Sequence, residues 1–283
     1  MVETVIGKPV LELCKVSKSF HRRGFPPVTA AREVDLHVCE AETVALVGES
    51  GSGKSTLAKI ALGLVRPDAG EVKLFGKTIS GLPMGQLREV RTAMQPVFQD
   101  SSAAFNPRRT VTQLLSQAAI RHPSPIGTMR ERLIILLEQV GLRPGEDYLG
   151  RFPHELSGGQ RQRLSIARAL AMDPPIIIAD EPLSGADVSI RGQLLNLMID
   201  LREKRKVAYL FITHDISIAK AFAHRVAVMY KGSIVERGNA DEVLANPQHE
   251  YTKRLVEGSL TVEQAEKAVE AISHKMESGV AAS

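Results

Sequence analysis

The nine residues at positions 48–56 combine glycines, hydroxyl side chains and one lysine at a fixed spacing. They are Gly48, Glu49, Ser50, Gly51, Ser52, Gly53, Lys54, Ser55 and Thr56. In the pattern G-x-x-x-x-G-K-[ST], glycines let a tightly folded backbone aim successive N–H groups at phosphate oxygens. Lys54 provides a cation for the β- and γ-phosphates, and the Ser55 hydroxyl is placed to hold Mg²⁺.

The flanking sequence supplies the elements that this loop needs. An apolar, strand-like run at 43–47 precedes it, and a helix-prone run at 57–62 follows it. The positive end of that helix points at the same anion. A glycine-rich turn between a strand and a helix is the plain alternative, but this context favours a nucleotide phosphate cradle.

An acidic pair ends a second apolar run. Asp180 and Glu181 follow the apolar residues 176–179. A buried strand that ends in a carboxylate beside a phosphate cradle can organise Mg²⁺, and a second acid can polarise an attacking water. Many strands end in Asp or Glu, so the cradle gives this pair its weight. We expect Asp180 to bind the metal with Ser55, and Glu181 to act as general base.

A third segment offers another place for an anion. It consists of Leu156, Ser157, Gly158, Gly159 and Gln160, and a helical run at 161–171 follows. A serine and two glycines at a helix N-terminus present a hydroxyl, bare N–H groups and the helix dipole. One triphosphate does not need two such sites in one chain. The pair makes sense if two subunits meet head to tail, each nucleotide clasped between one cradle and the other helix start.

The order of apolar runs indicates an α/β fold. Strand-like runs at 10–16, 33–38, 43–47, 71–75, 176–180, 207–213, 225–230 and 233–236 alternate with helical segments after a β-rich start. This predicts a largely parallel sheet with helices on both faces and an antiparallel N-terminal layer. Between about 100 and 172 the pattern is helical alone. One helix there, 130–140, should end at Gly141.

We therefore expect one domain over 1–260, with a helical subdomain at about 100–172 inserted into a nucleotide-binding core. The segment 261–283 differs in character, because apolar residues recur in it at alternating spacings of three and four. Thr261 and Gln264 could form a capping box at its start. We expect a helical tail that is partly disordered, and it is too short to indicate a coiled coil.

Composition places the chain among ordinary globular proteins. Its 283 residues are 43% hydrophobic, enough for a sizeable core, and no apolar run approaches the ~18 residues that cross a bilayer. The N-terminus lacks the features of a secretory signal, which predicts a cytoplasmic location. Cys14 and Cys39 are too few for a four-ligand metal cluster, and both are expected to be buried thiols.

The charge pattern does not indicate nucleic-acid binding. The net charge is +4 and the pI about 9.1, but the basic excess is spread along the chain. Short basic clusters such as 204–206 lack interleaved aromatic residues, and the chain has no tryptophan. Base stacking is therefore poorly provided for, and no nucleic-acid partner is expected.

With these three segments in this order, the chain resembles the nucleotide-binding subunits of ABC transporters. Residues 156–160 match that family's signature motif residue for residue, and the cradle and acidic strand match its two phosphate-site motifs. The resemblance covers roughly 10–260. It implies a P-loop NTPase (RecA-like) core with an antiparallel β layer and an inserted α-helical subdomain, with ATP and Mg²⁺ as cofactors.

The resemblance also implies roles for four further residues. Gln99 matches the Q-loop glutamine, which touches Mg²⁺ or the water, and His214 matches the switch histidine at the γ-phosphate. Phe20 is placed like the aromatic residue that stacks on adenine, although Phe25 competes with it. Asp187 corresponds to the D-loop aspartate, which lies where two cassettes meet. Each has a plainer alternative as a surface or core residue, and the Gly-Ala at 185–186 departs from the family's usual Ala-Leu.

Other stretches resemble one branch of the family, the ATPases of dipeptide, oligopeptide and nickel uptake systems. They lie at 94–100, 105–111, 187–191 and 247–255. The resemblance implies a peripheral subunit on the cytoplasmic face of the membrane, partnered by permease subunits and a second, often different, ATPase. A periplasmic binding protein would be an indirect partner. No iron–sulfur cluster is expected, because the cysteine-rich element of some members is missing.

One alternative function remains open, and two others are disfavoured. The runner-up is a soluble ABC-type ATPase of a metabolic complex, such as one for phosphonate breakdown. Nucleic-acid maintenance ATPases share the signature but typically insert long coiled coils or double the domain. A simpler P-loop kinase leaves 156–160 unexplained. The motifs do not distinguish among a peptide, a nickel chelate, an opine and glutathione as cargo.

Overall fold

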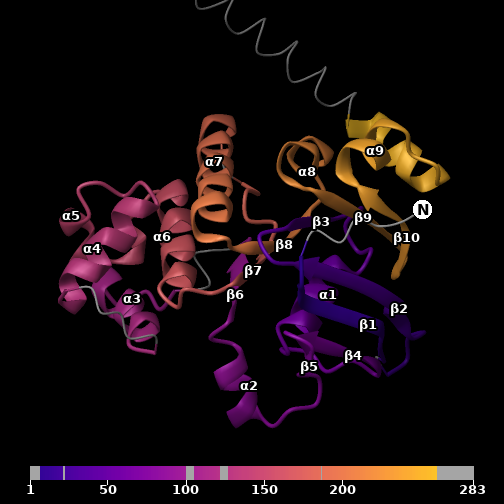
Figure 1. The fold of residues 1–283 in the computed structure, drawn as a ribbon, viewed down its shortest axis with the longest axis horizontal. Coiled ribbons are helices and arrows are strands. Elements are labelled where there is room, and N and C mark those ends of the chain that lie inside the picture. The colour runs from indigo at the N-terminus through magenta and orange to yellow at the C-terminus, as the bar shows by residue number, and fades with distance from the viewer. Residues whose placement is uncertain (1–6, 22, 100–104, 122–126, 186, 260–283) are drawn as a thin grey trace, which may run out of the picture.

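A six-stranded sheet forms the centre of the molecule (Figure 1). The computed structural model describes residues 7–21, 23–99, 105–121, 127–185 and 187–259; the predicted tail at 261–283 lies outside them. The strand order is β10-β9-β3-β8-β7-β6, parallel except for the antiparallel pair β9–β10. The strands are β3 (Thr43–Val47), β6 (Met94–Phe98), β7 (Ile176–Asp180), β8 (Ala208–Thr213), β9 (Arg225–Tyr230) and β10 (Ser233–Asn239).

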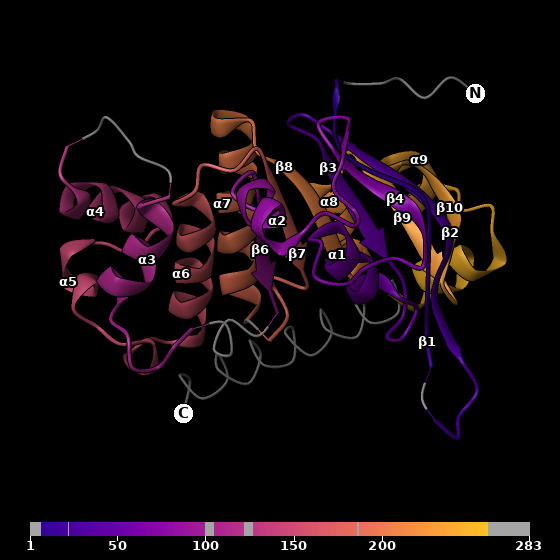
Figure 2. The ribbon, with the colours of Figure 1, turned by 90° about the horizontal axis from the view of Figure 1, so that it is seen from below.

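A second, antiparallel sheet has the order β2-β1-β4-β5. Its strands are β1 (Pro9–Phe20), β2 (Val28–Cys39), β4 (Ala69–Leu74) and β5 (Lys77–Thr78). In Figure 2 the β1–β2 hairpin projects from the body, at the end opposite to helices α3–α6. This is the antiparallel layer expected from the β-rich start of the chain.

The helices cover both faces of the central sheet. They are α1 (Lys54–Ala61), α2 (Met84–Val90), α3 (Val111–Ala119), α4 (Met129–Gln139), α5 (Glu146–Leu149), α6 (Gly158–Leu170), α7 (Val188–Arg205), α8 (Ile216–Phe222) and α9 (Ala240–Ala245). Helix α4 starts at a Thr128–Glu131 capping box and is followed by Gly141 at φ +77°. Between β6 and β7 the described residues form helices α3–α6 and no strand, and we call this part of the chain the helical lobe.

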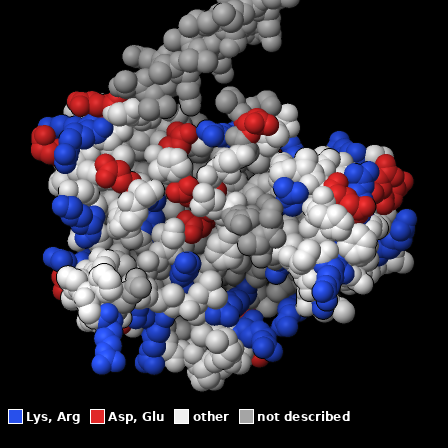
Figure 3. All heavy atoms as spheres, turned by 180° about the vertical axis from the view of Figure 1, so that it is seen from behind, with Lys and Arg blue, Asp and Glu red and all other residues white. Residues whose placement is uncertain are grey.

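Charged side chains of both signs are scattered over the face drawn in Figure 3, with Lys and Arg most prominent along its lower edge. Within the described residues, no helix is long and apolar enough to cross a membrane. Cys39 is buried as expected, but the expectation was wrong for Cys14, which is half-buried. Successive residues of a strand point to opposite sides, so Cys14 lies outward of the buried Leu13.

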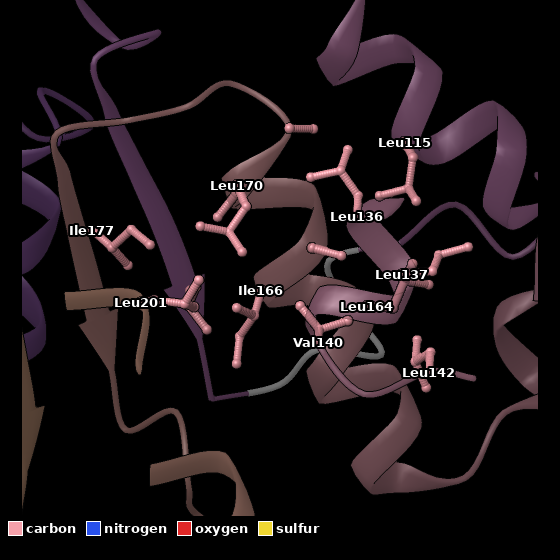
Figure 4. Packing of buried hydrophobic residues seen from close by; sticks show 14 of the residues in the cluster. Leu115, Leu136, Leu137, Val140, Leu142, Leu164, Ile166, Leu170, Ile177 and Leu201 are labelled. Atoms are coloured by element: carbon pink, nitrogen blue, oxygen red, sulfur yellow. The ribbon is translucent and has the colours of Figure 1, made fainter. Parts of the chain in front are cut away.

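Alternate residues of the central strands enter different cores. Ile177, Ala179 and Phe211 pack with helices α3–α7, whereas Ile178 and Leu210 pack with α1 and the antiparallel sheet. Figure 4 shows Ile166 and Leu170 of α6 between Ile177 of β7 on one side and Leu136 and Leu137 of α4 on the other, all in one cluster. The helical lobe thus shares one continuous core with the sheet that carries the acidic pair.

Two strands could not be recognised in the sequence. β6 was missed because Gln95 and Pro96 interrupt its apolar pattern; it lies at the sheet edge, where proline is tolerated. β5 has only two residues. The strands β1 and β2 are also longer than expected, because half-buried polar residues near their paired ends, Ser17, Lys18, Ser19 and Thr29, interrupt the apolar pattern.

Candidate nucleotide site

The phosphate loop at 48–53 connects β3 to α1 and approaches its neighbours closely. Gly48 and Gly53 have φ angles of +149° and +111°. A Cβ on Gly53 would lie 2.0 Å from the Ala30 carbonyl oxygen, and one on Gly48 would lie 2.3 Å from that of Met229. Only glycine fits such positions. The helix begins at Lys54, earlier than the helix-prone run at 57–62 indicated.

The Lys54 ammonium lies within the loop. Its Nζ donates hydrogen bonds to the carbonyl oxygens of Gly48 at 2.6 Å and Glu49 at 2.8 Å. Burial lowers the pKa of Lys54, while the charges of Glu181 and Asp180 oppose that shift. A buried ammonium beside the N-terminus of α1 suits a phosphate group, so the residues present fit the expected anion. Ser52 is buried too, whereas Glu49, Ser50, Gly51 and Ser55 are exposed and Thr56 is half-buried.

Ser55 and Asp180 meet as predicted. The Ser55 hydroxyl donates to the Asp180 carboxylate at 3.1 Å, across 125 residues of sequence. Burial raises the pKa of Asp180, and the hydrogen bond from Ser55 acts in the other direction. No group of three or more His, Cys, Asp or Glu among the described residues could hold a metal ion alone. A hydroxyl and a carboxylate are oxygen ligands that suit Mg²⁺, whose remaining ligands are usually water and phosphate.

Glu181 and His214 also lie together. The His214 Nδ1 and the Glu181 Oε2 are 3.1 Å apart. β7 and β8 are adjacent parallel strands, so the residues that follow their carboxyl ends meet at one edge of the sheet. Glu181 has a φ of +49°, and its N–H donates to the Ile212 carbonyl at 2.9 Å. A backbone in this uncommon conformation is held by the neighbouring strand and aims the carboxylate at His214.

Gln99 reaches the same edge from β6. Its Nε2 donates to the Ser184 hydroxyl at 3.1 Å. Gln99, Ser55 and Asp180 line one cleft of about 550 Å³ between the core and helix α6. Ser184 was not predicted as a site residue. Its position three residues after Glu181 could have indicated that it lies near the acidic pair.

The signature segment lies apart from that cleft. Ser157 caps α6: its hydroxyl accepts from the Gln160 N–H at 3.2 Å, and the Gln160 side chain accepts from the Ser157 N–H at 2.9 Å. Gly158 is exposed, and a Cβ on Gly159 would lie 3.1 Å from the Ile190 side chain. No residue of 156–160 lines the cleft beside Asp180. Ser157 is exposed as well, and the role of this segment as a second anion site stays a prediction.

Three residues given possible roles by the family resemblance lie at the periphery. Phe20 ends β1 opposite Val28, is 44% exposed, and has the Lys18 ammonium 5.6 Å from its ring centroid. Phe25 is 62% exposed, so exposure does not decide which ring meets adenine. Asp187 is exposed at the N-cap of α7 without a capping hydrogen bond from its side chain. The roles of all three stay predictions.

Replacing Asp180 with asparagine is expected to lower the affinity for MgATP without lowering the thermal stability of the protein. The amide removes a buried charge, so the melting temperature without nucleotide should equal or exceed that of the wild type. Affinity for MgATP should fall roughly tenfold or more, the size of one lost charge-assisted contact. Differential scanning calorimetry and titration with and without EDTA measure both effects. Unchanged MgATP affinity would exclude Asp180 as a metal ligand.

A family model described as ABC transporter matches residues 31–184, just over half of the chain. The chain belongs to the ABC transporter family. Relatives named Glutathione import ATP-binding protein GsiA, from Salmonella paratyphi A and Escherichia coli, are each 44% identical to it over 262 residues. The match covers 90% of this chain and 42% of each relative, so the chain spans less than half the length of these curated relatives.

Solved structures confirm the predicted fold class. The ATP-binding cassette MJ0796, a dimer in a post-hydrolysis state bound to ADP and Pi, is 30% identical with a TM-score of 0.73. The match covers 81% of this chain and 98% of that cassette. CbiO1 of Clostridium perfringens has a TM-score of 0.74 at 24% identity, over 95% and 99% of the two chains, and shows the fold alone. The family match and the 30% identical cassette together show that this chain is an ABC-type ATPase cassette.

Proposed function

We propose that this chain is the ATP-hydrolysing subunit of an ABC importer for peptides or related small solutes. The observation that carries the proposal is the 44% identity to import ATPases over 90% of the chain. The relatives' name makes glutathione the first cargo to test. None of the names favours a soluble metabolic complex.

Each proposed catalytic step uses a contact described above. When bound, ATP supplies the phosphoanhydride bond, and Mg²⁺ neutralises charge on its phosphates. The Lys54 ammonium would turn from the loop carbonyls to the β- and γ-phosphates, and Ser55 and Asp180 would hold Mg²⁺. Gln99 holds the water or metal from the cleft side. Glu181 accepts a proton from the attacking water, and His214 orients that carboxylate and contacts the γ-phosphate.

The proposed working unit is a head-to-tail pair of cassettes. The solvent-facing signature segment of one cassette would close the phosphate loop of the other, with Asp187 near the contact. Support comes from the exposure of Ser157 and from the relative MJ0796, which was solved as a dimer. ATP binding would favour this closed state and hydrolysis would release it, which biases a two-state permease. We expect this chain to pair with a different ATPase subunit and not with a second copy of itself.

A shallow hollow on the helical lobe is the proposed permease contact. Its volume is about 590 Å³, and it is lined by polar residues of 106–117 with the 70% exposed Ile120 at its rim. Arg108 and Arg109 are exposed within it. We propose that a cytoplasmic segment of the permease enters here, which places the chain at the inner face of the membrane.

Charge reversal at Arg108 or Arg109 should uncouple the cassette from the permease. We expect permease-stimulated ATPase activity in membranes to fall severalfold, while basal hydrolysis by the free protein is unchanged, because neither arginine touches the nucleotide site. Arg130→Glu, an exposed change on α4 outside the hollow, is the matched control. A parallel loss of basal and coupled activity would make the stretch structural and refute the docking role.

The function itself is tested by transport. Membrane vesicles that hold this ATPase, its permeases and the binding protein should take up radiolabelled glutathione or a dipeptide only with ATP. Lys54→Ala should abolish that uptake. ATP hydrolysis without any uptake, for every solute of the peptide and nickel-chelate classes, would contradict an importer.

A further inference from the structure

A hydrogen bond to a distant part of the chain holds the phosphate loop in position. Residues 250–259 form a helical segment after α9, beside β9 and β10 in Figure 1. Tyr251 in this segment is 2% exposed. Its hydroxyl oxygen accepts a hydrogen bond from the Glu49 N–H at 2.8 Å, across 202 residues of sequence. In the sequence analysis, residues 247–255 indicated only a resemblance to the ATPases of peptide and nickel uptake systems.

Tyr251 is held in place from two sides. Its ring stacks on Tyr230, with 4.2 Å between centroids and 30° between planes. Tyr230 ends β9, which pairs with β3 directly before the loop. The Glu236 carboxylate on β10 accepts from the N–H groups of Gln248 at 2.8 Å and His249 at 3.0 Å. The phenol is therefore presented by a braced segment and not by a free end.

The far half of the loop is held independently. The Gly232 N–H, in the turn between β9 and β10, donates to the Ser52 carbonyl at 2.9 Å. The loop is thus fixed at the Glu49 N–H by Tyr251 and at the Ser52 carbonyl by the β9–β10 turn. Donors held in position before a ligand arrives need no reorganisation on binding, and this raises affinity.

We propose that Tyr251 is a positioning residue for the phosphate loop, and that helical segment 250–259 is therefore coupled to nucleotide binding. Tyr251 does not touch the nucleotide; it acts by holding the backbone at Glu49. The coupling is reciprocal: a nucleotide that favours the ordered loop also favours the docked segment. The inference rests on the proposed role of the loop as phosphate cradle.

The first test measures the tie itself, without nucleotide. In Tyr251→Phe the ring and its stacking remain but the acceptor is gone, so the Glu49 amide should exchange with deuterium roughly tenfold faster or more. Tyr230→Phe removes the other hydroxyl of the stacked pair and should leave that exchange rate unchanged. Equal exchange in Tyr251→Phe and wild type would overturn the proposal.

The second test separates binding from chemistry. Tyr251→Phe should raise the KM for ATP roughly three- to tenfold, the effect of one hydrogen bond, with kcat within about twofold. An unchanged KM, or a fall in kcat alone, would overturn the coupling. MgADP should also slow amide exchange within 250–259 in the wild type, and less in Tyr251→Phe; equal slowing would count against reciprocity. If the wild type binds no nucleotide, the phosphate role fails instead, and the first test still decides the tie.

Discussion

Replacing Glu181 with glutamine is expected to reduce ATP turnover by roughly 10² or more while ATP still binds. Glutamine keeps the size and the hydrogen-bonding capacity of the side chain, so the 3.1 Å contact with His214 can persist. It cannot accept a proton from the attacking water. Lys54, Ser55 and Asp180 are unchanged, so the phosphates and Mg²⁺ keep their proposed ligands. Single-turnover hydrolysis and an ATP titration measure the two effects separately.

The same variant should trap the closed pair of cassettes. If hydrolysis opens the dimer, Glu181→Gln should shift from monomer to dimer on size exclusion when ATP is added, alone or with its partner ATPase. Adding Ser157→Arg should abolish the shift, because a bulky cation would fill the exposed helix start where the other cassette's phosphate is expected. Wild-type protein under hydrolysing conditions is the control.

Two results would count against this account in different ways. Normal turnover in Glu181→Gln would mean that another residue activates the water, and His214 is the first to test. A variant that binds ATP but stays monomeric with its partner present would contradict the head-to-tail arrangement and leave the phosphate site standing.

Lys54→Ala is expected to weaken ATP binding by about 2–3 kcal/mol, the size of a charge-assisted contact left unmade. This corresponds to roughly 30- to 150-fold in Kd. Isothermal titration with MgATP measures it, and Lys220→Ala, an exposed lysine in the last turn of α8, is the control. ATP affinity equal to that of the wild type would remove the basis of the phosphate cradle.

The contiguous parts of the site could be predicted because each carries its own chemistry. The glycines and Lys54 need only a strand before and a helix after. Asp180 and Glu181 need only to follow a buried strand, and the pairing of β7 with β8 brings His214 to them. The general geometry of parallel sheets brings together residues that follow the carboxyl ends of adjacent strands, but the role of His214 was predicted only from the family resemblance.

Contacts that join distant segments could not be predicted in the same way. The bond from Gln99 to Ser184 spans 85 residues, and that from Glu49 to Tyr251 spans 202. Each depends on how loops pack at one edge of the sheet, which no local periodicity encodes. The edge strand β6 was hidden for a different reason, since Pro96 breaks the apolar pattern that identifies a strand.

The ammonium of Lys54 donates hydrogen bonds to the carbonyl oxygens of Gly48 and Glu49, which belong to the same loop. If the loop binds phosphate as proposed, the incoming phosphate competes with these two carbonyl oxygens for the ammonium. The free energy of phosphate binding is then the difference between two sets of hydrogen bonds, those of the ammonium to phosphate and those to the loop carbonyls. It is smaller than the direct attraction between lysine and phosphate. A neutral or weakly charged compound of similar shape cannot drive that exchange. On this proposal, the loop discriminates against such compounds before any contact with the base or sugar is made.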